Sequence, residues 1–156
     1  MTKSEENLIF LSKEYDIDEL LSILPAHLKA EISYYLYEEA ILQIRILQNR
    51  DQRFYAHYIL KFEPMRIKAG TNFVEVGTKA LEVFFLLTGC VESLKQGKFF
   101  ASGAMFGETD IIFDRERQDT YAARMDCHIL RVHRNTFEQL LDEFDDFRED
   151  VEAVAE

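Results

Sequence analysis

Apolar positions recur at three- and four-residue spacing up to about residue 63, and this spacing predicts helices. Asp16 and Glu19 have the spacing of a capping box, so a first helix is predicted to begin there. Pro25 can open a second helix, because its fixed φ suits the first helical turn. A third helix is predicted to begin near Asp51. The apolar positions of these helices are Leu20, Leu21, Ile23, Leu24, Leu28, Ile32, Tyr35, Leu36, Phe54, Tyr58 and Ile59.

The pattern changes from Pro64 onward. All six glycines lie between residues 70 and 107, and the short runs among and after them favour β-structure: NFVEV, EVFFLL, KFFA and HILRV. Short strands separated by glycine are typical of a sandwich or a barrel. The run VFFLL at residues 83–87 is apolar at every position, so it is predicted to be a central strand that is buried on both faces.

Helical spacing returns from Asn135, which forms a second capping-box pattern with Glu138. An apolar stripe follows, and the opposite face of the predicted helix is acidic. The stripe consists of Phe137, Leu140, Leu141, Phe144, Phe147, Val151 and Val154. We expect it to pack on the chain's own barrel; a helix of a partner is the alternative.

Length and composition narrow the class of protein. The chain has 156 residues, of which 47% are hydrophobic, and this suits one compact domain with a small helical appendage. With 29 acidic and 18 basic residues the net charge is −11, which argues against nucleic acid as a partner. No apolar run approaches the roughly 18 residues that span a bilayer, so no membrane insertion by this segment is expected. The first residues also lack the basic start of a signal peptide.

The residues that carry most chemistry are scattered. His27, His57, His128 and His133 show no metal-ligand spacing, and no nucleophile motif or Walker-type loop is present. We therefore expect no enzyme, no catalytic residue, no metal site and no cofactor. Cys90 and Cys127 are predicted to be buried small side chains in a reducing compartment.

Residues 103–112, GAMFGETDII, resemble the start of the phosphate-binding cassette of cyclic-nucleotide-binding domains. That cassette reads Gly-x-x-Phe-Gly-Glu and continues with small and apolar residues. KAGTNFVEVG resembles the opening strand and turn of the same family, and VFFLLTGCVES resembles its central strand and the turn that follows. The resemblance implies a mixed α+β fold, in which a jelly-roll-like β-roll of about eight strands is flanked by N- and C-terminal helices.

Within the family, the first helices resemble those of ion channels. IDELLSILPAHLKAEISYYLYEEAIL is similar to the end of a C-linker, and FEQLLDEFDDFREDVEAVA is similar to the B helix and the start of the C helix. The resemblance implies C-linker-like helices over residues 1–45 and a binding domain with a truncated C helix over residues 46–156. It places the chain on the cytoplasmic side of a membrane protein, such as a potassium or other cyclic-nucleotide-regulated ion channel, or an ion transporter. Other subunits or domains of that parent protein would be its partners.

The resemblance also implies a ligand, cAMP or cGMP, and the side chains that bind it. Spacing without gaps places Arg117 on the family's phosphate-binding arginine, and Glu108 on the residue that accepts a hydrogen bond from the ribose 2′-hydroxyl. A short helix is expected to begin near Gly107, with its N–H groups facing the phosphate. The ligand-binding residues implied are Phe106, Gly107, Glu108, Thr109, Arg117, Gln118, Asp119 and Thr120.

One departure from the family pattern bears on binding. The family usually has Arg-(Thr/Ser)-Ala, and here the residues are Arg117, Gln118 and Asp119. A carboxylate at position 119 would repel the phosphate of the ligand and weaken binding. At 4 Å the penalty is about 1 kcal/mol in water and about 4 kcal/mol at an effective dielectric constant of 20. Asp119 is therefore expected either to pair with Arg117, as an internal substitute for the ligand's charge, or to point into solvent. Pairing of Arg117 with Asp114 is a third arrangement.

Two functions follow from these features. In the first, the domain binds a cyclic nucleotide and couples binding to gating through the N-terminal linker helices. In the second, it is a degenerate module that binds no nucleotide and serves assembly or protein interaction. Glu108, Gly107 and Arg117 favour the first function, whereas Gln118 and Asp119 favour the second.

Overall fold

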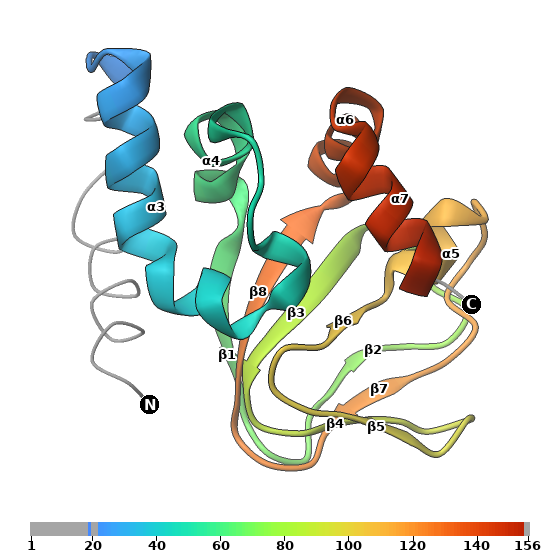
Figure 1. Ribbon diagram of the computed structural model, residues 1–156. Coiled ribbons are helices and arrows are strands. Elements are labelled where there is room, and N and C mark those ends of the chain that lie inside the picture. The colour runs from blue at the N-terminus through green and yellow to red at the C-terminus, as the bar shows by residue number, and fades with distance from the viewer. Residues whose placement is uncertain (1–18, 20–21, 155–156) are drawn as a thin grey trace.

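The computed structural model describes residues 19 and 22–154 (Figure 1). The helix predicted to begin at Asp16, with Leu20 and Leu21, lies outside these residues. The helices described are α3 (Ala26–Gln43), α4 (Gln52–Tyr58), α5 (Glu108–Ile112), α6 (Arg134–Glu143), α7 (Asp145–Val154) and two short 3-10 turns, η1 (Arg45–Leu47) and η2 (Ile59–Lys61). Two of the predicted helix starts are confirmed, because α3 follows Pro25 and the Asp51 carboxylate caps α4 by accepting from the Arg53 N–H at 2.8 Å.

Within the part of the chain that the structure describes, eight strands form two antiparallel sheets of four, as the β-roll prediction requires. One sheet has the order β1-β8-β3-β6 and the other the order β2-β7-β4-β5. The strands are β1 (Glu63–Ile67), β2 (Asn72–Val74), β3 (Glu82–Thr88), β4 (Val91–Ser93), β5 (Lys98–Phe100), β6 (Met105–Phe106), β7 (Tyr121–Ala123) and β8 (Cys127–His133). The helices α4, α6 and α7 cover the outer face of the first sheet, and the second sheet closes the roll on the other side (Figure 1).

Strand β3 separates two hydrophobic cores, because successive side chains on a strand point to opposite faces. Val83, Phe85 and Leu87 belong to the core under the helices, which we call the helix-side core. Phe84 and Leu86 belong to the core between the two sheets, which we call the roll core. The prediction of a central strand buried on both faces is confirmed, and it explains why residues 83–87 show no alternation of apolar and polar positions.

The C-terminal apolar stripe packs on the domain itself, as expected. Phe137, Phe144 and Phe147 are buried in the helix-side core. The ring of Phe54, from α4, lies 5.4 Å from the Phe144 ring and 5.2 Å from the Phe147 ring, measured between centroids. Val154 departs from the pattern, because it is largely exposed at the end of α7.

The start of α6 differs from the prediction of a capping box at Asn135. The helix begins one residue earlier, at Arg134, directly after strand β8. The side chain of His133 caps it, because its Nδ1 accepts a hydrogen bond from the Asn135 N–H at 3.1 Å. Glu138 instead pairs with Arg134 one turn away. The strand carries the chain straight into the helix, so the residue that ends β8 becomes the cap.

Arg50 joins the N-terminal part of the chain to α7. Its side chain is only 5% exposed, and its Nη2 lies 2.7 Å from Asp150 Oδ2. The guanidinium also pairs with Asp146 at 3.3 Å and lies 5.1 Å above the Phe147 ring. Segments about a hundred residues apart in the chain are thus held together by one buried cation.

Two further expectations concern the environment of the chain. None of the helices within residues 19 and 22–154 is both long enough and apolar enough to span a membrane. Both cysteines are unpaired thiols. Cys127 is buried as predicted, whereas Cys90 is only half-buried, because it lies in the turn between β3 and β4.

Candidate ligand-binding site

Buried polar side chains concentrate in one segment of the chain. Within the described residues, seven polar or charged residues are buried, and five of them lie between residues 108 and 120. The seven are Ser33, Ser93, Glu108, Asp110, Arg117, Asp119 and Thr120. A buried charge is costly unless it is paired or hydrogen-bonded. Such a concentration in the cassette segment, and not in the helix-side core, is typical of a functional site.

Gly107 forms the sharp turn between β6 and α5. Its φ is 86°, in the left-handed region that glycine adopts without strain, and it is the N-cap of α5. A Cβ at this position would lie 3.1 Å from Arg117 Nη1 and 3.2 Å from the Phe84 ring. The conformation and the space both require glycine here. The helix predicted to begin near Gly107 is confirmed.

Arg117 lies beneath this turn and is 3% exposed. Its Nη1 donates to the backbone carbonyl of Gly107 at 2.7 Å, and its Nη2 donates to the carbonyl of Glu82. The carboxylate of Asp110 lies 3.6 Å from Nη1. The guanidinium also lies over the Phe84 ring, 5.9 Å from its centroid. Two backbone carbonyls and the carboxylate of Asp110 therefore hold the guanidinium of Arg117 in place.

Glu108 opens α5 immediately beside the carbonyl that Arg117 binds. It is 7% exposed, and its Oε2 is a buried acceptor that has no hydrogen-bond partner within the described part of the chain. Burial raises the pKa of the Glu108 carboxyl above its ordinary value, although a backbone hydrogen bond, the Thr109 hydroxyl and the charges of Lys98 and Arg117 oppose the rise. A carboxylate oxygen that is both buried and unpartnered can accept a hydrogen bond from a ligand hydroxyl.

Both arrangements that were expected for the Asp119 carboxylate are wrong. Its carboxylate neither pairs with Arg117 nor points into solvent, because the residue is 6% exposed and turned toward the β4–β5 hairpin. It accepts hydrogen bonds from the Ser93 hydroxyl, from the N–H of Lys95 at 2.7 Å and Gln96 at 3.3 Å, and from the Thr120 N–H at 2.7 Å. Burial raises the pKa of Asp119, but these four bonds outweigh burial, so its pKa lies below the ordinary value. Asp119 is therefore bound to the hairpin.

Gln118 and Thr120, two other expected ligand-binding residues, lie next to these buried charged residues in the sequence. Gln118 is exposed, and its Nε2 donates to the Glu116 carbonyl at 2.9 Å. The hydroxyl of Thr120 is buried and accepts from the Val76 N–H at 3.0 Å, which ties β7 to the loop after β2. Contact of a ligand with Gln118 or Thr120 stays a prediction. The same holds for contact with Thr109 and with the backbone N–H of Asp119.

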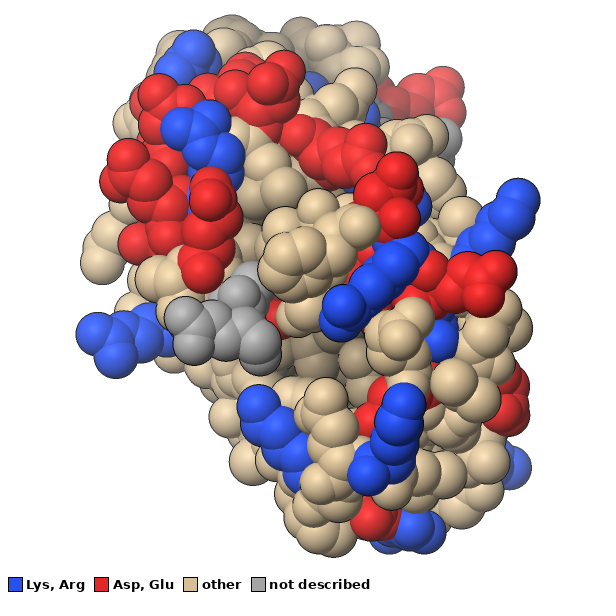
Figure 2. Space-filling view, turned by 90° about the vertical axis from the view of Figure 1, so that its right-hand side faces the viewer, with Lys and Arg blue, Asp and Glu red and all other residues tan. Residues whose placement is uncertain are grey.

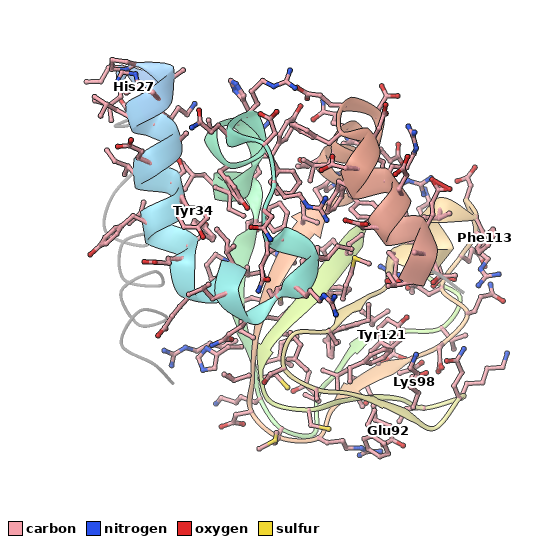
Figure 3. The ribbon with its side chains drawn as sticks, in the orientation of Figure 1. His27, Tyr34, Glu92, Lys98, Phe113 and Tyr121 are labelled. Atoms are coloured by element: carbon pink, nitrogen blue, oxygen red, sulfur yellow. The ribbon has the colours of Figure 1, made fainter. Side chains whose placement is uncertain are left out.

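Aromatic rings form the wall behind the cassette. Phe106 lies at the centre, with ring centroids of Phe100 at 5.0 Å, Phe84 at 5.3 Å and Tyr121 at 5.3 Å. Figure 3 shows Tyr121 inside the roll and Lys98 at its rim. Burial raises the pKa of Tyr121 to about 12, despite the opposing charge of Arg117. The wall behind the cassette is therefore apolar and aromatic.

Asp110 is the site residue that sequence reasoning missed. It is 4% exposed, and it pairs with Arg117 at 3.6 Å and with Arg115 at 2.9 Å. The third arrangement considered for Arg117, pairing with Asp114, is wrong, because Asp114 binds Arg134 at 2.7 Å. A signal was present in the sequence, since the family has small and apolar residues after Phe-Gly-Glu and this chain has an aspartate there.

A cavity of about 780 Å³ lies between η1, the β5–β6 segment and α7, and the first residues of the cassette, Gly103, Ala104 and Met105, form part of its lining. Arg45, Arg50, Lys98, Asp146 and Asp150 line it, so both signs of charge face it. Figure 2 shows a cluster of acidic side chains in the upper part of the face that it draws, with Lys and Arg side chains among them and also in the lower part. Within the described residues, no three His, Cys, Asp or Glu side chains form a group that could hold a metal ion.

The arrangement of roll, cassette turn and buried arginine defines a class of protein. Residues 64–144, just over half of the chain, match the profile of the cyclic nucleotide-binding domain, and the chain belongs to this family. Two curated relatives are the potassium/sodium hyperpolarization-activated cyclic nucleotide-gated channels 2 of Mus musculus and 4 of Homo sapiens. Each is 23% identical over 149 residues, which is 94% of this chain but only 17% and 12% of the respective channel. The chain thus spans less than a fifth of these relatives.

Solved structures share the fold. A cAMP-bound regulatory subunit, PfPKA-R, superimposes with a TM-score of 0.66 at 21% identity, over 80% of this chain and 45% of that one. The regulatory subunit of a cAMP-independent protein kinase A from Trypanosoma brucei superimposes with a TM-score of 0.65 at 16% identity, over 79% of this chain and 47% of that one. The binding domain itself is a non-catalytic module.

Proposed function

We propose that this chain is a regulatory domain that binds cAMP or cGMP and belongs to an ion channel or ion transporter on the cytoplasmic side of a membrane. In this proposal, ligand binding at the cassette is coupled to gating through the N-terminal helices. Family membership supports the class of ligand. The similarity to hyperpolarization-activated channels over 94% of the chain supports the channel context.

The observation that carries the proposal is the buried carboxylate of Glu108. Its Oε2 has no partner among the described residues, and an unsatisfied buried acceptor is costly. The 2′-hydroxyl of a ribose would supply the missing donor. Arg117, held beside Gly107, supplies the positive charge that a cyclic phosphate requires, and bonds between guanidinium and phosphate are among the strongest in proteins.

Coupling to the N-terminal part is supported by the helix-side core. Side chains of α3, η1 and α4 share this core with α6, α7 and β3, and α5 contributes Ile111 to it. A shift of the cassette helix on ligand binding would therefore alter the packing on which the N-terminal helices rest. A ligand moves such an equilibrium only by its difference in affinity for the two arrangements.

Contacts between subunits belong to the same proposal. Apolar side chains of α3 are exposed, among them Tyr35 at 74% and Leu42 at 59%. In a channel these side chains would face neighbouring subunits, as C-linker helices do. Light scattering on a longer protein that contains this chain would reveal oligomers. A strict monomer at high concentration would count against the channel context.

The alternative function is a module that binds no nucleotide and serves assembly. One observation favours it: the donors of Arg117 already bind two carbonyls, and a carboxylate lies beside them. The related Trypanosoma brucei subunit is described as belonging to a cAMP-independent kinase, so membership of the fold does not by itself imply cAMP regulation.

The test compares ligands that differ only at the 2′ position. The wild-type chain should bind cAMP or cGMP at least tenfold more tightly than the corresponding 2′-deoxy nucleotide, because a good hydrogen bond to a charged group contributes about 1.5–3 kcal/mol. Glu108→Ala should abolish that preference. Glu116→Gln, an exposed acid in the same loop, is the matched control and should retain it. If no cyclic nucleotide binds, the assembly function is the correct one.

A further inference from the structure

Asp110 occupies an unusual position in the cassette. Its carboxylate is buried in α5 between two arginines, with Oδ1 2.9 Å from Arg115 Nε and Oδ2 3.6 Å from Arg117 Nη1. The family pattern has small and apolar residues in this part of the cassette. The arginine that would bind phosphate therefore already has a negative charge of the protein beside it.

We propose that Asp110 is an internal counter-ion that competes with the phosphate of a cyclic nucleotide for Arg117 and so sets the affinity of the site. The inference rests on the proposed function. A phosphate that approaches Arg117 brings a second negative charge close to Asp110, and like charges repel strongly where water is scarce. The ligand must either displace the carboxylate or bind against its repulsion. Both reduce the affinity for charged ligands.

Arg115 is a second ion-pair partner of Asp110, so the Asp110 carboxylate can stay paired when it moves away from Arg117. Arg115 is 45% exposed at its side chain, whereas Arg117 is 3% exposed, so the first can follow a moving carboxylate more easily than the second. When phosphate binds Arg117, Asp110 keeps Arg115 as its counter-ion. The carboxylate is then not left as an unpaired buried charge, which would otherwise be prohibitive.

The expected effect depends on the phosphate and not on the nucleoside. Asp110→Ala and Asp110→Asn should each bind cAMP or cGMP at least tenfold more tightly than the wild type. Adenosine and guanosine, which lack the phosphate, should bind all three proteins equally within about twofold. Asp110→Asn keeps the shape of the side chain, so it separates the loss of charge from the loss of volume.

Asp114→Asn is the matched control, because Asp114 lies four residues after Asp110, just beyond the end of α5. Its side chain is 84% exposed and pairs with Arg134, not with Arg117. The affinity of the Asp114→Asn variant for cyclic nucleotides should equal that of the wild type. If Asp114→Asn raised the affinity for a cyclic nucleotide as much as Asp110→Asn does, the cause would be a general effect of net charge. That result would overturn the inference.

Isothermal titration of the four proteins distinguishes the remaining outcomes. If the wild type binds a cyclic nucleotide and both Asp110 variants bind it equally or more weakly, the inference is wrong and the proposed function stands. Binding that appears only in the Asp110 variants would support both. If none of the folded proteins binds, the proposed function falls and the inference falls with it. If neither Asp110 variant folds, Asp110 is a structural partner of the arginines and the inference is wrong.

Discussion

The two cores of this domain are both apolar, and they differ in what lies beside them. The helix-side core is a set of apolar and aromatic side chains, with Phe54 at the meeting point of α4, α6 and α7. The roll core is bordered by the cassette, where Glu108, Asp110, Arg117 and Asp119 are all buried. Burial of apolar surface stabilises a fold, whereas buried charges need partners and often do not stabilise it. We therefore expect the helix-side core to contribute more to stability than the buried charges of the cassette.

The largest effect is expected on the helix side. Phe54→Ala removes a fully buried ring that contacts four other rings, so the free energy of unfolding should fall by about 3–5 kcal/mol. Because no titrating group is removed, the loss should be the same at acidic and neutral pH. Urea unfolding measures it, with Phe99→Ala, a ring that is 59% exposed, as the control. A loss below 1 kcal/mol would contradict the division between the two cores.

A smaller effect that depends on pH is expected at Asp119. Its carboxylate accepts four hydrogen bonds, so Asp119→Asn should lower the free energy of unfolding by about 1–3 kcal/mol at neutral pH. The folded-state pKa of Asp119 is depressed below 3.8, so its contribution is complete above that value and is lost as the pH falls through the folded-state pKa. Wild type and variant should therefore converge as the pH falls through the folded-state pKa of Asp119.

Unfolding measured between pH 2 and pH 7 tests this convergence. Affinity for nucleotide should change little in Asp119→Asn, because its side chain is bound to the β4–β5 hairpin. A large gain in affinity would instead restore the idea that Asp119 repels the ligand.

The smallest effect on the free energy of unfolding is expected at Glu108. Its dependence on pH has the opposite sign to that at Asp119. Burial raises its folded-state pKa above 4.5, so the folded state holds the proton more tightly than the unfolded state. The contribution of Glu108 to stability is therefore present below pH 4.5 and is lost as the pH rises through the folded-state pKa. Relative to Glu108→Gln, the wild type should become less stable as the pH rises through the folded-state pKa of Glu108. A difference that grows in favour of the wild type would contradict the burial of this carboxyl.

The fold was predictable because the two cores have clear patterns. Residues 83–87 are apolar throughout because β3 is covered on both faces, and the stripe from Phe137 to Val151 keeps helical spacing because one face packs on Phe54. The shortest strands were harder to predict. The two residues of β6 owe their assignment to pairing with Phe84 and Phe85, which is a contact between segments about twenty residues apart.

The site was only partly predictable. The positions of Gly107, Glu108 and Arg117 followed from spacing within one segment. The environment of Asp119 did not, because its partners Ser93, Lys95 and Gln96 come from a hairpin more than twenty residues away. Repulsion was inferred from the charge alone, whereas the hydrogen bonds decide where the carboxylate points. The burial of Asp110 was not predictable either, because it depends on pairing with Arg115 and Arg117, which the fold of the cassette brings beside α5.

The central claim is that Glu108 and Arg117 form a site for a cyclic nucleotide, and titration calorimetry with cAMP and cGMP tests it most directly. The account predicts saturable binding of at least one of them to a single site of the wild type. Arg117→Ala should weaken that binding by about 2 kcal/mol or more, roughly thirtyfold, because the charged clamp on the phosphate is lost. Absence of binding at millimolar nucleotide, or equal affinity of wild type and Arg117→Ala, would contradict it.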